Sequence, residues 1–228
     1  MTARTLSAGP ATILYDDTLV SHADEALFAP PVRAAVAGGR GAAWIVPAAD
    51  GGEWVLRHYR RGGLPAKIVA DVYLWTGLEH TRPWREWRLL AEMHALGLPV
   101  PRPVAARVAR DGIGYRGDLI TRRVPAARSL AELLAPGTAA SIPWRAVGAC
   151  IRRFHEAGVW HADLNAHNIL VDDTGGVWLI DFDRGEWRSG DEAWKQENLA
   201  RLRRSLHKLG HDEAQGWQAL QQGYAKPA

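Results

Sequence analysis

Three prolines at alternate positions, Pro99, Pro101 and Pro103, constrain the fold of this chain more than any other local feature. Proline has no backbone N–H to donate inside a helix, and it disfavours the helical conformation of the residue before it. This segment must therefore be extended. It ends a helix predicted over Pro83–Leu96, which has proline in its first turn and Gly97 directly after its last residue.

The residues before position 122 otherwise have the pattern of short strands. Ala42–Val46 and Trp54–Tyr59 flank Asp50-Gly51-Gly52, a turn-forming sequence typical of a β-hairpin. Two more strands are predicted over Val104–Val108 and Gly117–Thr121. This half of the chain therefore predicts a small antiparallel sheet with one helix.

Helices dominate the second half. One is predicted over Pro143–Ala157, and Ile169–Val171 and Val177–Ile180 then form a short hairpin. The last predicted helix carries four leucines at helical spacing, Leu199, Leu202, Leu206 and Leu209. We therefore predict one domain of the α+β class with two lobes, a strand-rich lobe over residues 1–121 and a helical lobe over residues 122–228.

Composition excludes several classes of protein. A formal net charge of +3 is too small to argue for a nucleic-acid partner. The single cysteine, Cys150, cannot form an intrachain disulfide and fits a reducing compartment. We expect no transmembrane helix, because no apolar run reaches 18 residues, and no signal peptide, because Asp16 and Asp17 interrupt the first apolar stretch.

The stretch Trp160–Asn168, followed by Asp181-Phe182-Asp183, carries the chemistry. Phosphoryl transfer needs a carboxylate to orient the attacking hydroxyl, ligands for Mg²⁺ and positive charge near the phosphates. Asp163 can accept the proton of the hydroxyl, while Asn168 and Asp181 can offer oxygen atoms to the metal. The predicted hairpin between them returns Asp181 to the level of Asn168, so spacing and local structure converge on one point. A zinc site built from His161, Asp163 and His167 is the rival interpretation, but nothing else in the chain completes it.

The sequence His-Ala-Asp-Leu-Asn-Ala-His-Asn followed by Asp-Phe-Asp resembles the catalytic and metal loops of the protein-kinase superfamily. The resemblance implies a protein-kinase-like fold, ATP and Mg²⁺. It also implies that Asp163 is the catalytic base, that Asn168 and Asp181 bind the metal, and that His161 braces the loop.

The first half matches this superfamily less closely. Gly39 and Gly41 resemble the start of a nucleotide-covering glycine loop, although the third glycine is absent. Arg57 stands where kinases place the lysine that holds the ATP phosphates, and it can form an ion pair with Glu86. Lys67 is the other candidate for that role.

A protein acceptor is not expected, because no Ala-Pro-Glu segment follows Asp181. Instead, residues 56–64 and 160–185 resemble the 3-deoxy-D-manno-octulosonic acid (Kdo) kinases, which are relatives of the lipopolysaccharide core heptose kinases of Gram-negative bacteria. This resemblance implies transfer of the ATP γ-phosphate to the 4-hydroxyl of Kdo on a lipid A precursor, at the cytoplasmic face of the inner membrane. It implies no protein partner.

The implied acceptor is anionic, which suits Arg60 and Arg61 beside Gly62-Gly63 as an anion-binding bend. Asp183 replaces the glycine usual at the third position of the metal loop and can add a metal or sugar contact. Two alternatives stay open: a soluble kinase of the aminoglycoside or choline type, and a catalytically dead kinase fold that serves as a binding module.

Overall fold

The structure is a computed structural model. It describes residues 1–29, 35–36, 43–48, 50–60, 71–136, 142–190, 192–211 and 214–225. The chain divides into two compact units. Unit 1 comprises Met1–Glu92 and Pro101–Arg123, and unit 2 comprises Met93–Val100 and Val124–Ala228. The change at Arg123 lies two residues beyond the predicted lobe boundary, and Met93–Val100 belongs to the second unit rather than the first.

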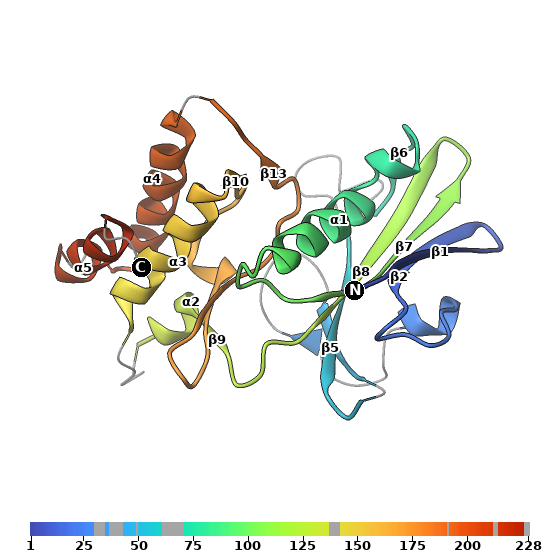
Figure 1. Cartoon of the computed structure of the whole chain (residues 1–228), viewed down its shortest axis with the longest axis horizontal. Helices are drawn as coiled ribbons and strands as arrows, with labels where there is room; N and C mark the ends of the chain where they lie inside the picture. Colours follow the sequence, from blue (N-terminus) through green and yellow to red (C-terminus); the bar gives the residue numbers. More distant parts are fainter. Residues whose placement is uncertain are drawn as a thin grey trace. The chain divides into compact units, whose positions relative to one another are not determined.

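Unit 1 is built on an eight-stranded antiparallel sheet (Figure 1). Its strand order is β1-β2-β7-β8-β5-β4-β3, with β6 paired to β8 beside this path. Two short 3-10 helices, Glu25–Phe28 and Leu78–His80, accompany it. The strands are β1 (Ala3–Ala8), β2 (Ala11–Asp16), β3 (Ala35–Val36), β4 (Ala43–Pro47), β5 (Glu53–His58), β6 (Tyr73–Leu74), β7 (Pro103–Asp111) and β8 (Gly114–Arg122).

The predicted β4–β5 hairpin is confirmed. Ala43 pairs with Arg57 and Pro47 with Glu53, so the register runs the whole length of β4. The turn closes because the N–H of Gly52 donates to Oδ1 of Asp50 at 3.1 Å. This register places Trp54 and Leu56 of β5 on the face that is buried.

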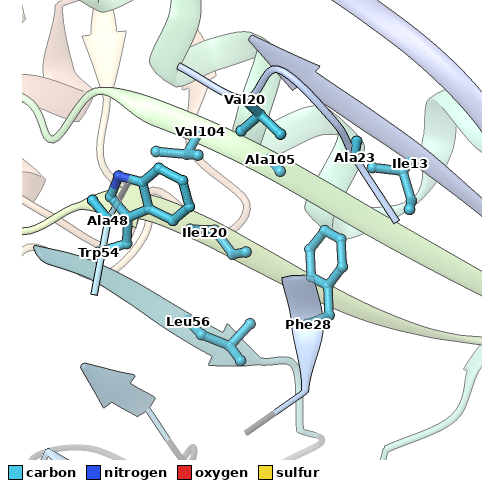
Figure 2. Packing of buried hydrophobic residues seen from close by; sticks show 10 residues of the cluster. All are labelled: Ile13, Val20, Ala23, Phe28, Ala48, Trp54, Leu56, Val104, Ala105 and Ile120. Carbon is cyan, nitrogen blue, oxygen red and sulfur yellow. The ribbon is translucent and has the colours of Figure 1, made fainter. Parts of the chain in front are cut away.

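The core of unit 1 collects side chains from sequence-distant strands (Figure 2). Alternate residues of a strand point to the same face, so Trp54 and Leu56 of β5 meet Ile120 of β8 and Ile13 of β2 there. The other members of this cluster are Val20, Ala23, Phe28, Ala48, Val104 and Ala105. Burial of this apolar surface holds the sheet in shape.

Helix α1 (Arg82–Ala95) confirms the helix predicted beside the proline segment. It docks on β8, where the backbone N–H of Arg82 donates to the Tyr115 hydroxyl at 3.0 Å. A Cβ at Gly117 would lie 2.6 Å from Pro83, so glycine permits this close approach. Gly97, two residues after the last helical residue, has a φ of 71°. There the N–H of Leu98 donates to the carbonyl of Met93 at 3.0 Å, a glycine-terminated helix end.

Unit 2 combines helices with two small antiparallel sheets, ordered β12-β11-β9 and β10-β13. The predicted hairpin after the catalytic loop is confirmed as β11 paired with β12. The elements are β9 (Arg128–Ser129), α2 (Leu130–Leu133), α3 (Trp144–Glu156), β10 (Val159–Trp160), η4 (Ala166–Asn168), β11 (Ile169–Val171), β12 (Val177–Leu179), β13 (Glu186–Trp187), α4 (Ala193–Lys208) and α5 (Ala214–Ala225).

Helix α5 corrects the prediction that the leucine-bearing helix, α4, is the last. It packs along α3 with the backbones very close, because a Cβ on Gly148 would overlap the carbonyl of Leu220. A Cβ on Gly223 would likewise overlap the carbonyl of Arg145. Glycine lowers intrinsic helix propensity, so α5 is hard to predict from the sequence. The glycines of α3 and α5 nevertheless permit the close packing of the two helices.

The predicted α+β class with an antiparallel sheet is confirmed. Cys150 is buried and unpaired, and burial raises the pKa of its thiol to about 12, so it behaves as a small core residue. None of the helices in the described part of the chain is both long enough and apolar enough to cross a bilayer.

Candidate active site

His161 braces the loop that carries Asp163. Its Nδ1 accepts the backbone N–H of Asp163 at 3.1 Å, so Nε2 carries the proton and donates to the carbonyl of Ile180 at 2.9 Å. The residue is only 2% exposed, and burial lowers the pKa of its imidazole. The hydrogen bond to the Ile180 carbonyl opposes this lowering of the pKa, and so do the charges of Asp181 and Asp163. A neutral histidine thus ties the loop to the end of β12.

Asn168 makes the second connection. Its side-chain N–H donates to the backbone carbonyl of Asp163 at 2.9 Å. The backbone carbonyl of Asn168 accepts the N–H of Ile180 at 3.1 Å. With the amide nitrogen committed in this way, the amide oxygen is the group that Asn168 can offer to a metal. The segments that bear Asp163, Asn168 and Asp181 therefore form one hydrogen-bonded unit.

Asp181 follows directly from the β11–β12 hairpin, in which Ile169 pairs with Leu179. It has a φ of 62°, a left-handed conformation that is uncommon for residues other than glycine and is often found at functional sites. Asp183 lies in the next turn, where the N–H of Gly185 donates to the carbonyl of Phe182 at 2.7 Å. The Phe182 ring packs against His161, with centroids 4.6 Å apart.

The oxygen atoms of Asn168 and Asp181 are of the kind that Mg²⁺ prefers, whereas His161 does not suit the rival zinc site. No group of three histidine, cysteine, aspartate or glutamate side chains suited to a metal occurs among the described residues. Both nitrogens of His161 are already engaged, which removes it from the rival zinc interpretation. Asn168 and Asp181 supply one amide and one carboxylate oxygen, which suits a hard cation that keeps several waters and binds substrate phosphates.

Helix α4 holds the catalytic loop through three side chains on one face. Asn198 is bonded to both backbone groups of His161, with its Nδ2 donating at 3.0 Å and its Oδ1 accepting at 3.3 Å. The Ser205 hydroxyl accepts the N–H of Ala166 at 3.1 Å. Between them Arg201 donates its Nε to Oδ1 of Asp163 at 2.9 Å, and its Nη2 donates to the same oxygen.

In unit 1, the predicted ion pair between Arg57 and Glu86 is confirmed, with Nη2 and Oε2 2.5 Å apart. The Tyr59 hydroxyl also donates to Oε2 of Glu86 at 2.5 Å. The Glu86 side chain is only 2% exposed, so a buried carboxylate fixes the guanidinium at the end of β5. The pairing is shown; its role with nucleotide stays a prediction.

Of the other site residues predicted in this half of the chain, the structure describes Arg60. Arg60 is exposed and follows β5. Gly39, Gly41, Arg61 and Lys67 lie outside the described residues.

Residues 33–224 match the family model described as "Lipopolysaccharide kinase (Kdo/WaaP) family". This chain belongs to that family. A protein of Stenotrophomonas maltophilia (strain K279a) is 48% identical over 207 residues, which cover 88% of this chain and 82% of the relative. One from Xanthomonas axonopodis pv. citri (strain 306) is 49% identical, with the same coverage, and one from Xanthomonas oryzae pv. oryzae (strain PXO99A) is 45% identical over 95% of this chain and 90% of the relative. All three relatives are named 3-deoxy-D-manno-octulosonic acid kinase.

Membership of the lipopolysaccharide kinase family confirms that the chain is a kinase and confirms the resemblance seen in its sequence. Sequence reasoning missed Asn198, Arg201 and Ser205, which lie more than 35 residues from their partners in the loop. A signal was present, because their spacing of three and four residues puts them on one helical face. The same helix also carries leucines at helical spacing, which are its stronger pattern.

Proposed function

We propose that this protein transfers the γ-phosphate of ATP to the 4-hydroxyl of Kdo on a lipid A precursor, in the synthesis of the lipopolysaccharide core. The observation that carries the proposal is the hydrogen-bonded unit of Asp163, Asn168 and the Asp181 segment, found in a chain of the lipopolysaccharide kinase family. The names of the relatives support Kdo as the acceptor.

In this proposal Asp163 accepts the proton of the acceptor hydroxyl as its oxygen forms a bond to the γ-phosphorus. The bond from that phosphorus to the bridging oxygen breaks, and ADP leaves with the electron pair. Asn168 and Asp181 would hold Mg²⁺, which when bound would neutralise charge on the phosphates. His161 keeps the loop and the Asp181 segment in register throughout.

The other assignments are proposals of the same kind. Arg57 holds the ATP phosphates, because the buried Glu86 carboxylate fixes its guanidinium. Gly39 and Gly41 cover the nucleotide. Arg60, Arg61 and Asp183 meet the anionic acceptor. We propose that the enzyme works as a peripheral protein at the cytoplasmic face of the inner membrane, where such an acceptor would lie.

The decisive test is incubation of purified protein with γ-labelled ATP, Mg²⁺ and one of three acceptors: Kdo-bearing lipid A precursor, an aminoglycoside or choline. We expect label only on the Kdo-bearing precursor, and we expect NMR of the product to place the phosphate at position 4. Label on an aminoglycoside or on choline alone would replace the proposed acceptor.

Asp163→Ala is the matched inactive variant. We expect kcat to fall by about 10²–10⁴-fold, the usual contribution of a general base. The melting temperature should hardly change, because the Asp163 side chain is 47% exposed. Asp181→Ala should instead weaken binding of Mg²⁺-ATP in calorimetry. Unchanged turnover in the first variant, or unchanged nucleotide affinity in the second, would remove that residue from its role.

A further inference from the structure

Arg201 holds the carboxylate of Asp163 through a single oxygen. Arg201 donates both Nε and Nη2 to Oδ1, and within the described part of the chain no hydrogen bond reaches Oδ2. An arginine that met both oxygens side by side would occupy the whole carboxylate. The observed contact fixes the group and leaves one oxygen for chemistry.

We propose that Arg201 is a positioning residue for phosphoryl transfer: it holds Asp163 through Oδ1 so that Oδ2 receives the proton of the acceptor hydroxyl. This inference rests on the proposed function, because it assigns a division of labour between the two oxygens of the proposed base. It adds a residue, on a helix 38 positions along the chain, that the catalytic-loop motif does not contain.

The setting of Arg201 makes its guanidinium a fixed point. Asn198 and Ser205 lie on either side of it along α4, and both are hydrogen-bonded to the backbone of the same loop. Helix and loop are therefore joined before and after the Asp163 contact. A planar guanidinium also constrains the direction of its N–H groups more than a lysine ammonium would.

A contribution to folding stability does not explain why Arg201 and Asp163 are paired. Both side chains are 47% exposed, and exposed pairs contribute little to folding because solvent screens them. Within the loop itself, the residues between Asp163 and Asn168 are Leu164, Asn165, Ala166 and His167, so the loop has no lysine or arginine of its own there. The cation that orients the base comes from α4.

The opposite role, a contact that blocks Asp163 until Arg201 moves away, makes a different prediction. A blocking arginine would raise turnover when removed, whereas a positioning arginine would lower it. The free Oδ2 favours positioning, because a blocked base would have both oxygens covered.

The experiment compares Arg201→Ala and Arg201→Lys with Arg204→Ala, a matched control at an exposed position of the same helix. We expect Arg201→Ala to lower kcat by about 10²-fold, the scale associated with a misplaced catalytic group. The KM for ATP should stay within about twofold of wild type, since a catalytic-step defect leaves ground-state binding intact. Arg201→Lys should recover part of kcat, and Arg204→Ala should match wild type.

Chemical rescue separates orientation from a general loss of structure. Guanidinium ions, far below denaturing concentrations, should restore part of the turnover of Arg201→Ala and none of that of Asp163→Ala. Three results would overturn the proposal: an unchanged or raised kcat in Arg201→Ala, an equal loss in Arg204→Ala, or an absence of rescue.

A second readout keeps this inference separate from the choice of acceptor. If wild-type protein transfers no phosphate to the Kdo-bearing precursor, the proposed function fails, and NMR of the Arg201 Nε–H then decides the pairing. We expect that signal, assigned by its loss in Arg201→Lys, to shift in Asp163→Asn. A signal that does not move would sink the positioning role.

Discussion

The two units of the molecule hold their charged side chains in contrasting ways. In unit 1 the carboxylate of Glu86 is buried and accepts hydrogen bonds from Arg57 and Tyr59. In unit 2 the pair of Asp163 and Arg201 is half-exposed, and both N–H groups of Arg201 meet the same carboxylate oxygen. The first arrangement makes loss of the arginine costly, because the remaining buried charge would be poorly compensated. The second contributes little to stability, because solvent screens it, and under our proposal it leaves Oδ2 of Asp163 accessible to the acceptor hydroxyl.

The histidines repeat this contrast. In unit 1, the hydrogen bond to Asp118 raises the pKa of His58 against the opposing effect of burial, and Asp71 adds to the rise. In unit 2, burial lowers the pKa of His155 to about 4. Its ring nitrogens lie 2.8 Å from the Tyr224 hydroxyl and 3.4 Å from Oδ1 of Asn198. Unit 1 thus stabilises a charged imidazole, whereas unit 2 stabilises a neutral one.

The largest effect on stability should come from breaking the buried ion pair. Arg57→Ala removes the guanidinium that pairs with the buried Glu86 carboxylate, and we expect a loss of about 3–5 kcal/mol in the free energy of unfolding. The matched variant in unit 2, Arg201→Ala, should lose less than about 1 kcal/mol, because its pair is exposed. Urea denaturation of both proteins measures the difference. Equal losses of unfolding free energy in the two variants would contradict the contrast between the two ion pairs.

The next effect concerns the close packing of α3 and α5. Gly148→Ala inserts a Cβ against the carbonyl of Leu220, and we expect unit 2 to lose about 1–3 kcal/mol through overpacking. The sign is informative, because the same substitution at an open helical position stabilises a helix by roughly 1 kcal/mol. Hydrogen exchange of α3 and α5 amides should report the loss. A gain in protection would contradict the glycine-mediated packing.

A further effect, of about the same size, is the response to acid. The folded-state pKa of His155, about 4, lies below that of an unfolded histidine, so the unfolded chain binds the extra proton. The stability that the neutral ring supplies is complete above pH 6.5 and is lost as the pH falls towards 4. The loss should be about 2 kcal/mol at pH 5.

His58 should act in the opposite direction. Its raised pKa contributes stability at acid pH, and this contribution disappears as the pH rises through the folded-state value. Hydrogen exchange at pH 7 and pH 5, read separately for α3 and β5, tests both signs. Equal acid sensitivity of these two elements would break the comparison.

Local sequence signals predicted much of the structure correctly. The turn sequences Asp50-Gly51-Gly52 and Asp172–Gly176 each join two apolar runs, and both predicted hairpins are confirmed. The kinase resemblance led to the Arg57–Glu86 pair, whose members are 29 residues apart. These features depend on short-range pattern or on a motif, and both are visible in one sequence.

The misses depend on tertiary packing. Helix α5 was missed because its glycines make sense only against α3. Arg201 was missed because nothing in the catalytic loop announces a partner on α4. Asp16, which the sequence treats as a polar interruption, is buried in β2 and accepts two hydrogen bonds from Arg102. Each case joins residues that no local pattern links.

The course of the chain through unit 1 limits how this kinase can be divided. The central strands β7 and β8 come after Met93–Val100, which belongs to unit 2. A fragment that stops at Glu92 would lack the middle of its sheet. A fragment that stops at Arg123 would separate Gly97 and Pro99 from their hydrogen-bond partners. Their carbonyls accept hydrogen bonds from Arg153 and Leu179 at 2.7 and 3.0 Å. A chimera that exchanges one unit between relatives therefore needs junctions at 92/93, 100/101 and 123/124 together, so recombination at a single crossover would produce a misassembled hybrid.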